Sequence, residues 1–251
     1  MIPLILHQTW KTSPPPGGFA ATWKQFNPDL RLRLYDDQDC RDFVAEEFPQ
    51  FLTRYDSFPF AIQRADFFRY LIVFRCGGWY ADLDMECLRP MQDLLHRGGA
   101  VFCVEAHLTP KRQEELGYCH PYQIANCIFA SEAGHPFLQG LIEEVAARER
   151  APILSDPKQV EDVAGPRMLT RFFYRQAAGP ILVLPQTYWL PPRWYPNLFP
   201  LNQHLYARHH FWGTWKTASG LKPSLRRRWI ERDRLPNPFP LSEGLHRLNR
   251  N

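Results

Sequence analysis

The stretch from Phe60 to Met85 constrains the fold most, because a helical pattern passes there into a strand pattern across two glycines. Apolar residues recur every three to four positions between Phe60 and Arg75, which predicts an amphipathic helix. Gly77 and Gly78 stand where the C-cap of this helix is expected. The short apolar run after them predicts a strand, so the stretch indicates one helix–strand unit of an α/β fold.

Two carboxylates end this unit, in the sequence Tyr80-Ala81-Asp82-Leu83-Asp84. On a strand, side chains at i and i+2 point to the same face, so Asp82 and Asp84 are expected to project together while Leu83 faces the core. If the strand ends there, the backbone can turn so that both acids reach one hard cation and its bound phosphates. The alternative is an edge strand with two solvated acids.

Strand and helix patterns alternate along the remaining chain, which favours an α/β sheet protein. Strands are expected at 2–6, 30–35, 101–104, 124–130 and 181–184. Helices are expected at 36–48, 135–148 and 160–176, the last interrupted at Gly165-Pro166. No internal repeat and no linker between two different halves is visible, so residues 1–251 are expected to form a single domain. The basic segment 220–251 contains a predicted helix from Leu225 to Arg234.

Composition limits the class of protein. A hydrophobic fraction of 45% supports a sizeable core and argues against disorder. The net charge of +4 fits a small anionic partner or a membrane surface and gives no case for nucleic acid. Six scattered cysteines without a C-x-x-C pair, and no pattern of a signal peptide or spanning segment, predict a cytoplasmic protein. The segment 220–251 can lie on the inner face of an anionic membrane, or be an ordinary solvated surface helix.

Asp66 and Arg69 lie one helical turn apart on the helix that leads into the two carboxylates. They can form an ion pair on an exposed face, a contact that contributes a few tenths of a kcal/mol. Phe67, Phe68 and Tyr70 surround them, however, and buried charges need partners. Beside a D-x-D motif, the arginine can neutralise a phosphate and the aspartate can bind a sugar hydroxyl.

Several sequence blocks follow one another in a fixed order. They are I-L-H-Q-T-W-K at 5–11, R-A-D-F-F-R-Y at 64–70, G-G-W-Y-A-D-L-D at 77–84 and H-H-F-W-G-T-W-K at 209–216. In this order the chain resembles the glycosyltransferases related to yeast initiating α-1,6-mannosyltransferase, known as glycosyltransferase family 32. A more distant similarity extends to the glucosyltransferase domains of large clostridial toxins.

The resemblance implies a GT-A fold, which is an α/β fold with a Rossmann-like, mixed central sheet flanked by helices. It also implies a retaining enzyme that moves a hexose from a nucleotide sugar to a saccharide or lipid-linked acceptor with an α-linkage. A divalent cation would bridge the D-x-D motif and the diphosphate, and Mn²⁺ is favoured over Mg²⁺. No feature demands guanine, so a UDP-sugar is favoured over a GDP-sugar. Four residues match the family's catalytic positions: Asp66, Arg69, Asp82 and Asp84.

Further residues match the family's donor-binding positions. Trp10 corresponds to an aromatic residue that stacks on the nucleotide base, with His7, Gln8 and Thr9 lining the same loop. Asn126 corresponds to an amide that can bind a sugar hydroxyl or a phosphate. Trp10 can equally be plain core, and Asn126 can equally satisfy a turn.

The C-terminal block supplies the last candidates. Only one of the adjacent histidines is expected to face the cation, and spacing to Trp215 favours His210 as the metal ligand. Trp215 is expected to close over the diphosphate. The sequence Gly165-Pro166 resembles a Thr-Gly-Pro that opens a helix near the family's site, but Ala164 replaces the threonine here.

Two other functions fit parts of the same pattern. A catalytically inactive nucleotide-sugar-binding protein would keep the fold without turnover, but all the expected acids and the arginine are present. A metal-dependent phosphohydrolase can also use D-x-D, although the additional Asp and His clusters typical of such sites are missing from the sequence.

Overall fold

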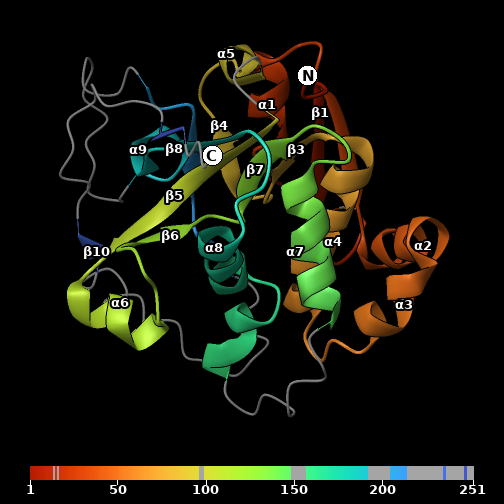
Figure 1. Cartoon of the computed structure of the whole chain (residues 1–251). Helices are drawn as coiled ribbons and strands as arrows, with labels where there is room; N and C mark the ends of the chain where they lie inside the picture. Colours follow the sequence, from red (N-terminus) through yellow and green to blue (C-terminus); the bar gives the residue numbers. More distant parts are fainter. Residues whose placement is uncertain are drawn as a thin grey trace.

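The computed structural model describes residues 1–13, 15, 17–95, 99–147, 157–191, 204–213, 234–235 and 246–247. A mixed sheet runs through the molecule in the order β11-β8-β5-β7-β3-β1-β2, and β6 and β10 pair with β5 (Figure 1). The strands of this sheet are β1 (Ile5–Thr9), β2 (Arg31–Tyr35), β3 (Gly78–Ala81), β5 (Ala100–Leu108), β6 (Tyr122–Ile124), β7 (Ile128–Ser131), β8 (Ile181–Leu184), β10 (Arg234–Leu235) and β11 (His246–Arg247). A separate two-stranded sheet pairs β4 (Met85–Cys87) with β9 (Ala207–His209).

Strand direction gathers several strand ends at one edge of the sheet. β1 runs parallel to both β2 and β3, and β7 runs antiparallel to β3 and to β5. The carboxyl ends of β1, β3 and β5 therefore lie at the same edge as the amino end of β7. Side chains that follow β3 or precede β7 are brought together there.

Helices cover both faces of the sheet. One apolar cluster packs α2 (Asp37–Glu47), α3 (Pro49–Asp56), α4 (Ala61–Cys76), α7 (Pro136–Ala147) and α8 (Pro166–Arg175) against the sheet. A second cluster packs α1 (Ala20–Phe26), α5 (Gln92–Leu95), α9 (Gln186–Trp189) and the β4–β9 pair against the other face. On β7, Phe129 belongs to the first cluster, while Ile128 and Ala130 belong to the second, as a period of two requires. The remaining helices are α6 (Pro110–Leu116) and the 3₁₀ helix η1 (Pro157–Asp162).

The helix before the two glycines is α4, and it is more deeply buried than an amphipathic pattern predicts. Eight consecutive residues of α4, from Asp66 to Val73, are buried. The helix ends at Cys76 and is capped by Gly77, with φ of 66°, as the sequence predicts. Gly78 follows with φ of 97°, and a Cβ there would lie 2.5 Å from the carbonyl oxygen of Ile5. Glycine is required at this position because β1 passes directly beside it.

The predicted α/β class, with a mixed central sheet flanked by helices, is confirmed. One expected element differs in detail. The strand predicted at 124–130 is divided between β6 and β7, since residues 125–127 form an irregular connection between these two strands. The interruption expected at Gly165-Pro166 in the helix at 160–176 is present, since η1 ends at Asp162 and α8 begins at Pro166.

Most of the predicted C-terminal helix lies outside the described residues, as does most of the segment 220–251. Within that segment the structure describes only β10 and β11, at 234–235 and 246–247. Within the described part of the chain, no helix combines the length and the apolar character needed to cross a membrane.

Candidate functional site

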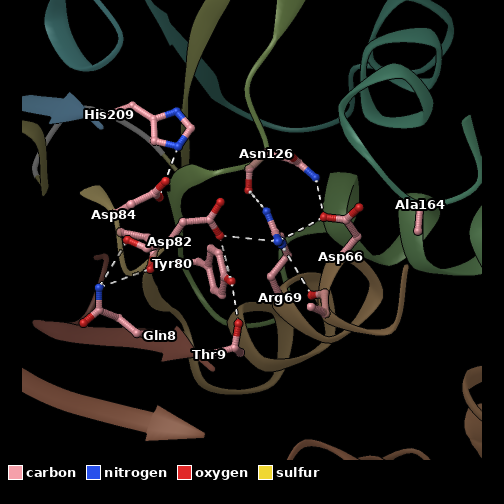
Figure 2. Close-up of polar contacts among 12 residues, drawn as sticks. Gln8, Thr9, Asp66, Arg69, Tyr80, Asp82, Asp84, Asn126, Ala164 and His209 are labelled. Carbon is pink, nitrogen blue, oxygen red and sulfur yellow. Dashed lines mark hydrogen bonds and ion pairs between the residues drawn. The ribbon is translucent and has the colours of Figure 1, made fainter. Parts of the chain in front are cut away.

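The two carboxylates of the D-x-D motif lie in a turn, not on a strand. β3 ends at Ala81, and the backbone N–H of Met85 donates to the carbonyl oxygen of Asp82 at 3.0 Å. The side chain of Gln8, on β1, donates to the carbonyl oxygens of Ala81 and Asp82 at 3.3 and 3.4 Å. The turn is therefore fixed by the neighbouring strand, and it aims both acids to one side (Figure 2).

Arg69 is the buried cation at the centre of the site. Its guanidinium lies 3.0 Å from Asp66 Oδ1 and 3.4 Å from Asp82 Oδ1, with 3% of the side chain exposed. It also donates to the carbonyl oxygen of Asn126 at 2.8 Å and lies over the ring of Tyr80 (Figure 2). Burial alone would lower the pKa of Arg69. The negative groups beside it, Asp82 and Asp66 among them, outweigh this effect and raise the pKa, so Arg69 stays cationic.

Asp66 is held in the same network from α4. Asn126 donates to Asp66 Oδ1 at 2.9 Å, so this oxygen is shared between the amide and Arg69. Burial raises the pKa of Asp66 to about 7, against the opposing effect of Arg69. The other oxygen, Oδ2, accepts no hydrogen bond from the described part of the chain. Gly165 stands next to it, since a Cβ at that position would lie 3.1 Å from Oδ2.

Asp82 lies between the buried cation and the second carboxylate. The hydroxyl of Tyr80 donates to its Oδ1 at 3.0 Å, and Thr9 in turn contacts that hydroxyl at 2.9 Å. Burial raises the pKa of Asp82; Arg69 opposes this shift, and the negative charge of Asp84 adds to it. A further positive charge beside Asp82 would favour its ionised form.

Asp84 has a different environment, supplied by the C-terminal block. His209 Nε2 lies 3.1 Å from Asp84 Oδ1, and the backbone N–H of Trp212 donates to Oδ2 at 2.8 Å. Burial alone would raise the pKa of Asp84, but the His209 contact and the Trp212 N–H outweigh it and lower the pKa. Phe211, with φ of 52°, turns the chain so that this N–H reaches Asp84. Left-handed backbone at a bulky residue costs about 1–3 kcal/mol, which the rest of the fold must offset.

Asp82, Asp84 and His209 form a group able to hold a metal ion. Each offers one ligand atom, and these atoms lie within 4.8 Å of one another. Carboxylate oxygens and one imidazole nitrogen suit Mn²⁺, and the carboxylates also suit Mg²⁺. The residues present therefore fit the divalent cation that the sequence predicts.

The structure places His209, and not the expected His210, beside the carboxylates of the D-x-D turn. His210 Nε2 lies 2.9 Å from Glu86, and its ring stacks on Phe19. His210 is thus not part of the group formed by Asp82, Asp84 and His209. The register of the β4–β9 pair, in which His209 lies opposite Met85, decides which histidine reaches Asp84. The sequence interpretation therefore preferred the histidine that is not part of this group, although the alternation of side chains left His209 as the other candidate.

The N-terminal block is divided between the core and the surface of the site. His7 is 1% exposed, and its two ring nitrogens contact the Tyr35 hydroxyl at 3.2 Å and the Gly77 carbonyl at 3.1 Å. Its ring is thus engaged within the fold and does not line the loop as predicted. Trp10 is half-buried and packs edge-on against Trp212, so the N-terminal block contacts the C-terminal block here. The expectation for Trp215 lies outside the described residues.

Two contributors escaped the sequence reasoning. Tyr80 bonds Asp82 and packs on Arg69, and its place within the G-G-W-Y-A-D-L-D block was the available signal. Trp212 contacts Asp84 through its main-chain N–H. Nearly every residue type carries this group, so no sequence pattern could indicate the contact.

Comparison with known proteins gives this geometry a context. The family model described as glycosyltransferase sugar-binding region containing DXD motif matches residues 18–99. Over 147 residues the chain is 37% identical to inositol phosphoceramide mannosyltransferase 3 of Schizosaccharomyces pombe, covering 57% of this chain and 37% of that protein. Over 165 residues it is 31% identical to the initiation-specific alpha-1,6-mannosyltransferase of Candida albicans, covering 57% and 42%. Mouse xyloside xylosyltransferase 1 matches with a TM-score of 0.44 at 13% identity, over 84% of this chain and 85% of the other.

The structural match is too weak to support an argument, and the sequence matches carry the comparison. The chain spans less than half the length of these two curated relatives. The region matched by the family model contains α4 and the D-x-D turn, the two elements that bring the buried charges together. Residues 18–99 therefore resemble the DXD-containing sugar-binding region of glycosyltransferases, and the expected resemblance of the chain to glycosyltransferase family 32 is confirmed.

Proposed function

We propose that the protein transfers a hexose from a nucleotide-diphosphate sugar to a hydroxyl group of a saccharide or glycolipid, with retention and an α-linkage. The observation that carries this proposal is the metal-competent group Asp82, Asp84 and His209 beside the buried Arg69. A divalent cation held by this group, together with Arg69, would supply the positive charges that stabilise a diphosphate. The names of both curated relatives support a mannosyl donor, and that of the Schizosaccharomyces pombe relative supports an inositol-containing glycolipid acceptor.

The chain's own residues divide the work of binding the donor. Arg69, fixed by Asp66 and the Asn126 carbonyl, would face the diphosphate and stabilise the charge that develops as the leaving group departs. Asp66 would accept a hydrogen bond from a sugar hydroxyl through Oδ2. Asp82, Asp84 and His209 would hold a divalent cation, which supplies Lewis-acid neutralisation of the diphosphate when bound.

Retention follows in this proposal from attack on the same face as the departing diphosphate. The bond between the anomeric carbon and the diphosphate oxygen breaks, and the acceptor oxygen forms the new bond to that carbon. The acceptor hydroxyl gives its proton to the departing phosphate oxygen. No enzyme nucleophile is needed, and among the described residues none stands out in the donor site.

The purified chain with Mn²⁺ and a panel of UDP- and GDP-linked mannose, glucose, galactose and N-acetylglucosamine tests the proposal. We expect one donor to raise the melting temperature and to release nucleoside diphosphate while its sugar appears in an acceptor. Asp82→Asn and Asp84→Asn should each abolish transfer, whereas the control Glu114→Gln, at an exposed position on α6, should not.

The same assay separates the competing functions. Donor binding without turnover would identify an inactive binding protein, and free sugar or phosphate without a glycosylated product would identify a hydrolase. Full transfer by both aspartate variants would refute the assignment of the D-x-D turn.

A further inference from the structure

Three aromatic side chains outside the donor-binding residues lie together where β6 begins and α8 ends. The rings of His120 and Tyr122 are nearly parallel, at an interplanar angle of 14°, with centroids 5.8 Å apart. The ring of Tyr174 stands edge-on to both, at 67° and 76°. His120 is exposed, and Tyr122 and Tyr174 are half-buried. These three side chains, the aromatic platform, therefore offer ring surface to solvent.

The aromatic platform is held in place by its neighbours. The hydroxyl of Tyr174 donates to the carbonyl oxygen of Tyr122 and lies 3.4 Å from the carbonyl oxygen of His120. The buried ring of Tyr118 packs edge-on against Tyr174, with centroids 5.8 Å apart. The Tyr118 hydroxyl in turn donates to the buried side chain of Gln123 at 3.2 Å. Rings that are fixed before a ligand arrives lose little conformational entropy when it binds.

Two parts of the chain run side by side from the aromatic platform to the donor-binding residues. They are α8 and the segment Gln123–Cys127, which follows Tyr122, and Figure 1 shows β6 beside α8. Midway, the hydroxyl of Thr170 accepts a hydrogen bond from the Ile124 N–H at 2.9 Å. At the far end, the last carbonyl oxygen of the segment accepts from the Asp82 N–H at 2.8 Å. The platform and the D-x-D turn are therefore joined by one continuous set of contacts.

Both parts of the chain end beside Asp66, which fixes the distance to the platform. Asn126 donates to Asp66 Oδ1 at 2.9 Å, and a Cβ on Gly165, the cap of α8, would lie 3.1 Å from Asp66 Oδ2. From Gly165 to Tyr174 the rise of an α-helix gives about 13 Å. From Tyr122 to Asn126 an extended chain spans at most about 13 Å. Two separate paths thus place the platform farther from the donor-sugar position than one sugar ring extends.

We propose that the aromatic platform binds a sugar ring of the acceptor other than the ring that carries the attacking hydroxyl. This inference rests on the proposed transfer function, and among its acceptors it selects a saccharide chain over a single sugar or inositol ring. Tyrosine and histidine rings suit this ligand, because their apolar faces pack on the C–H groups of a sugar while their polar atoms reach its hydroxyls. The chain would lie along α8, with one end at the donor and a later ring on the platform.

Acceptors of increasing length test the platform, with whichever donor of the UDP- and GDP-sugar panel the wild type uses. The probes are methyl α-mannoside, α-mannobiose, α-mannotriose and α-mannotetraose, and we expect the wild-type kcat/KM for the acceptor to rise along this series. His120→Ala and Tyr122→Leu should each lower it roughly two- to tenfold for the longest acceptor, the range for losing one aromatic contact. For methyl α-mannoside, which does not reach the platform, it should stay within about twofold of wild type.

The controls separate the failure of this inference from that of the proposed function. Glu114→Gln should match wild type with every acceptor, and His120→Tyr, which keeps a flat ring, should retain the preference for long acceptors. If the wild type neither binds a donor nor transfers sugar, the proposed function fails. If it transfers sugar but prefers inositol phosphoceramide in detergent micelles, or if both platform variants keep the wild-type length preference, the platform assignment alone is refuted. An equal loss with short and long acceptors would also refute it, because that result places the effect at the reacting atoms.

Discussion

Replacing His7 by Gln should flatten the pH dependence of the free energy of unfolding on the acidic side. Burial is the main reason that the pKa of His7 falls from 6.5 to about 4, against the opposing contact with the Gly77 carbonyl. Between these values the unfolded chain binds a proton that the folded chain does not. The contribution of this group to stability is therefore present above pH 6.5 and is lost as the pH falls toward 4.

The magnitude follows from the two pKa values. A full shift of this size corresponds to about 3 kcal/mol, and about 2 kcal/mol should be lost between pH 7.5 and pH 5. Urea unfolding at a series of pH values measures it as the difference between wild type and His7→Gln, which cancels the carboxylates that titrate in both. The exposed His120 gives the matched control, His120→Gln, which should keep the wild-type pH dependence. Equal losses of stability in His7→Gln and wild type between pH 7.5 and 5 would refute the reasoning.

Three further changes probe the site. Arg69→Met should cost about 3–5 kcal/mol in urea unfolding, because it leaves buried carboxylates without their cation; a loss below about 1 kcal/mol would contradict this. His209→Gln should weaken Mn²⁺ binding, measured by calorimetry, at least about tenfold, while His210→Gln should change it little; the reverse order would restore the sequence-based choice. Gly165→Ala should lower stability by about 1–3 kcal/mol and weaken donor binding in a thermal shift assay, since its Cβ would lie 2.8 Å from the Cα of Glu161. Wild-type stability and donor binding would show that η1 can shift to make room for the added methyl group.

The sequence predicted the parts of the site that depend on local spacing. Asp66 and Arg69 lie one turn apart on any helix, so their pairing was available from the periodicity alone. Asp82 and Asp84 were expected to lie together, and they do, although a turn rather than a strand brings them there. The glycine at the end of α4 was likewise predicted from its position after the apolar stripe.

The parts that depend on long-range pairing could not be predicted. Which histidine faces Asp84 is decided by the register between β4 and β9, two strands separated by more than a hundred residues. The burial of His7 follows from β1 lying between β2 and β3, which no local pattern specifies.

The segment Gln123–Cys127 limits how this protein can change. Because Asn126 contacts Asp66 and Arg69, and the Cys127 carbonyl accepts from the Asp82 N–H, an insertion or deletion there would displace these contacts in one step. Variation in donor or acceptor preference must then arise outside this segment, by single substitutions on the elements that face it. Related chains that differ in substrate are expected to keep its length constant while the residues around it vary.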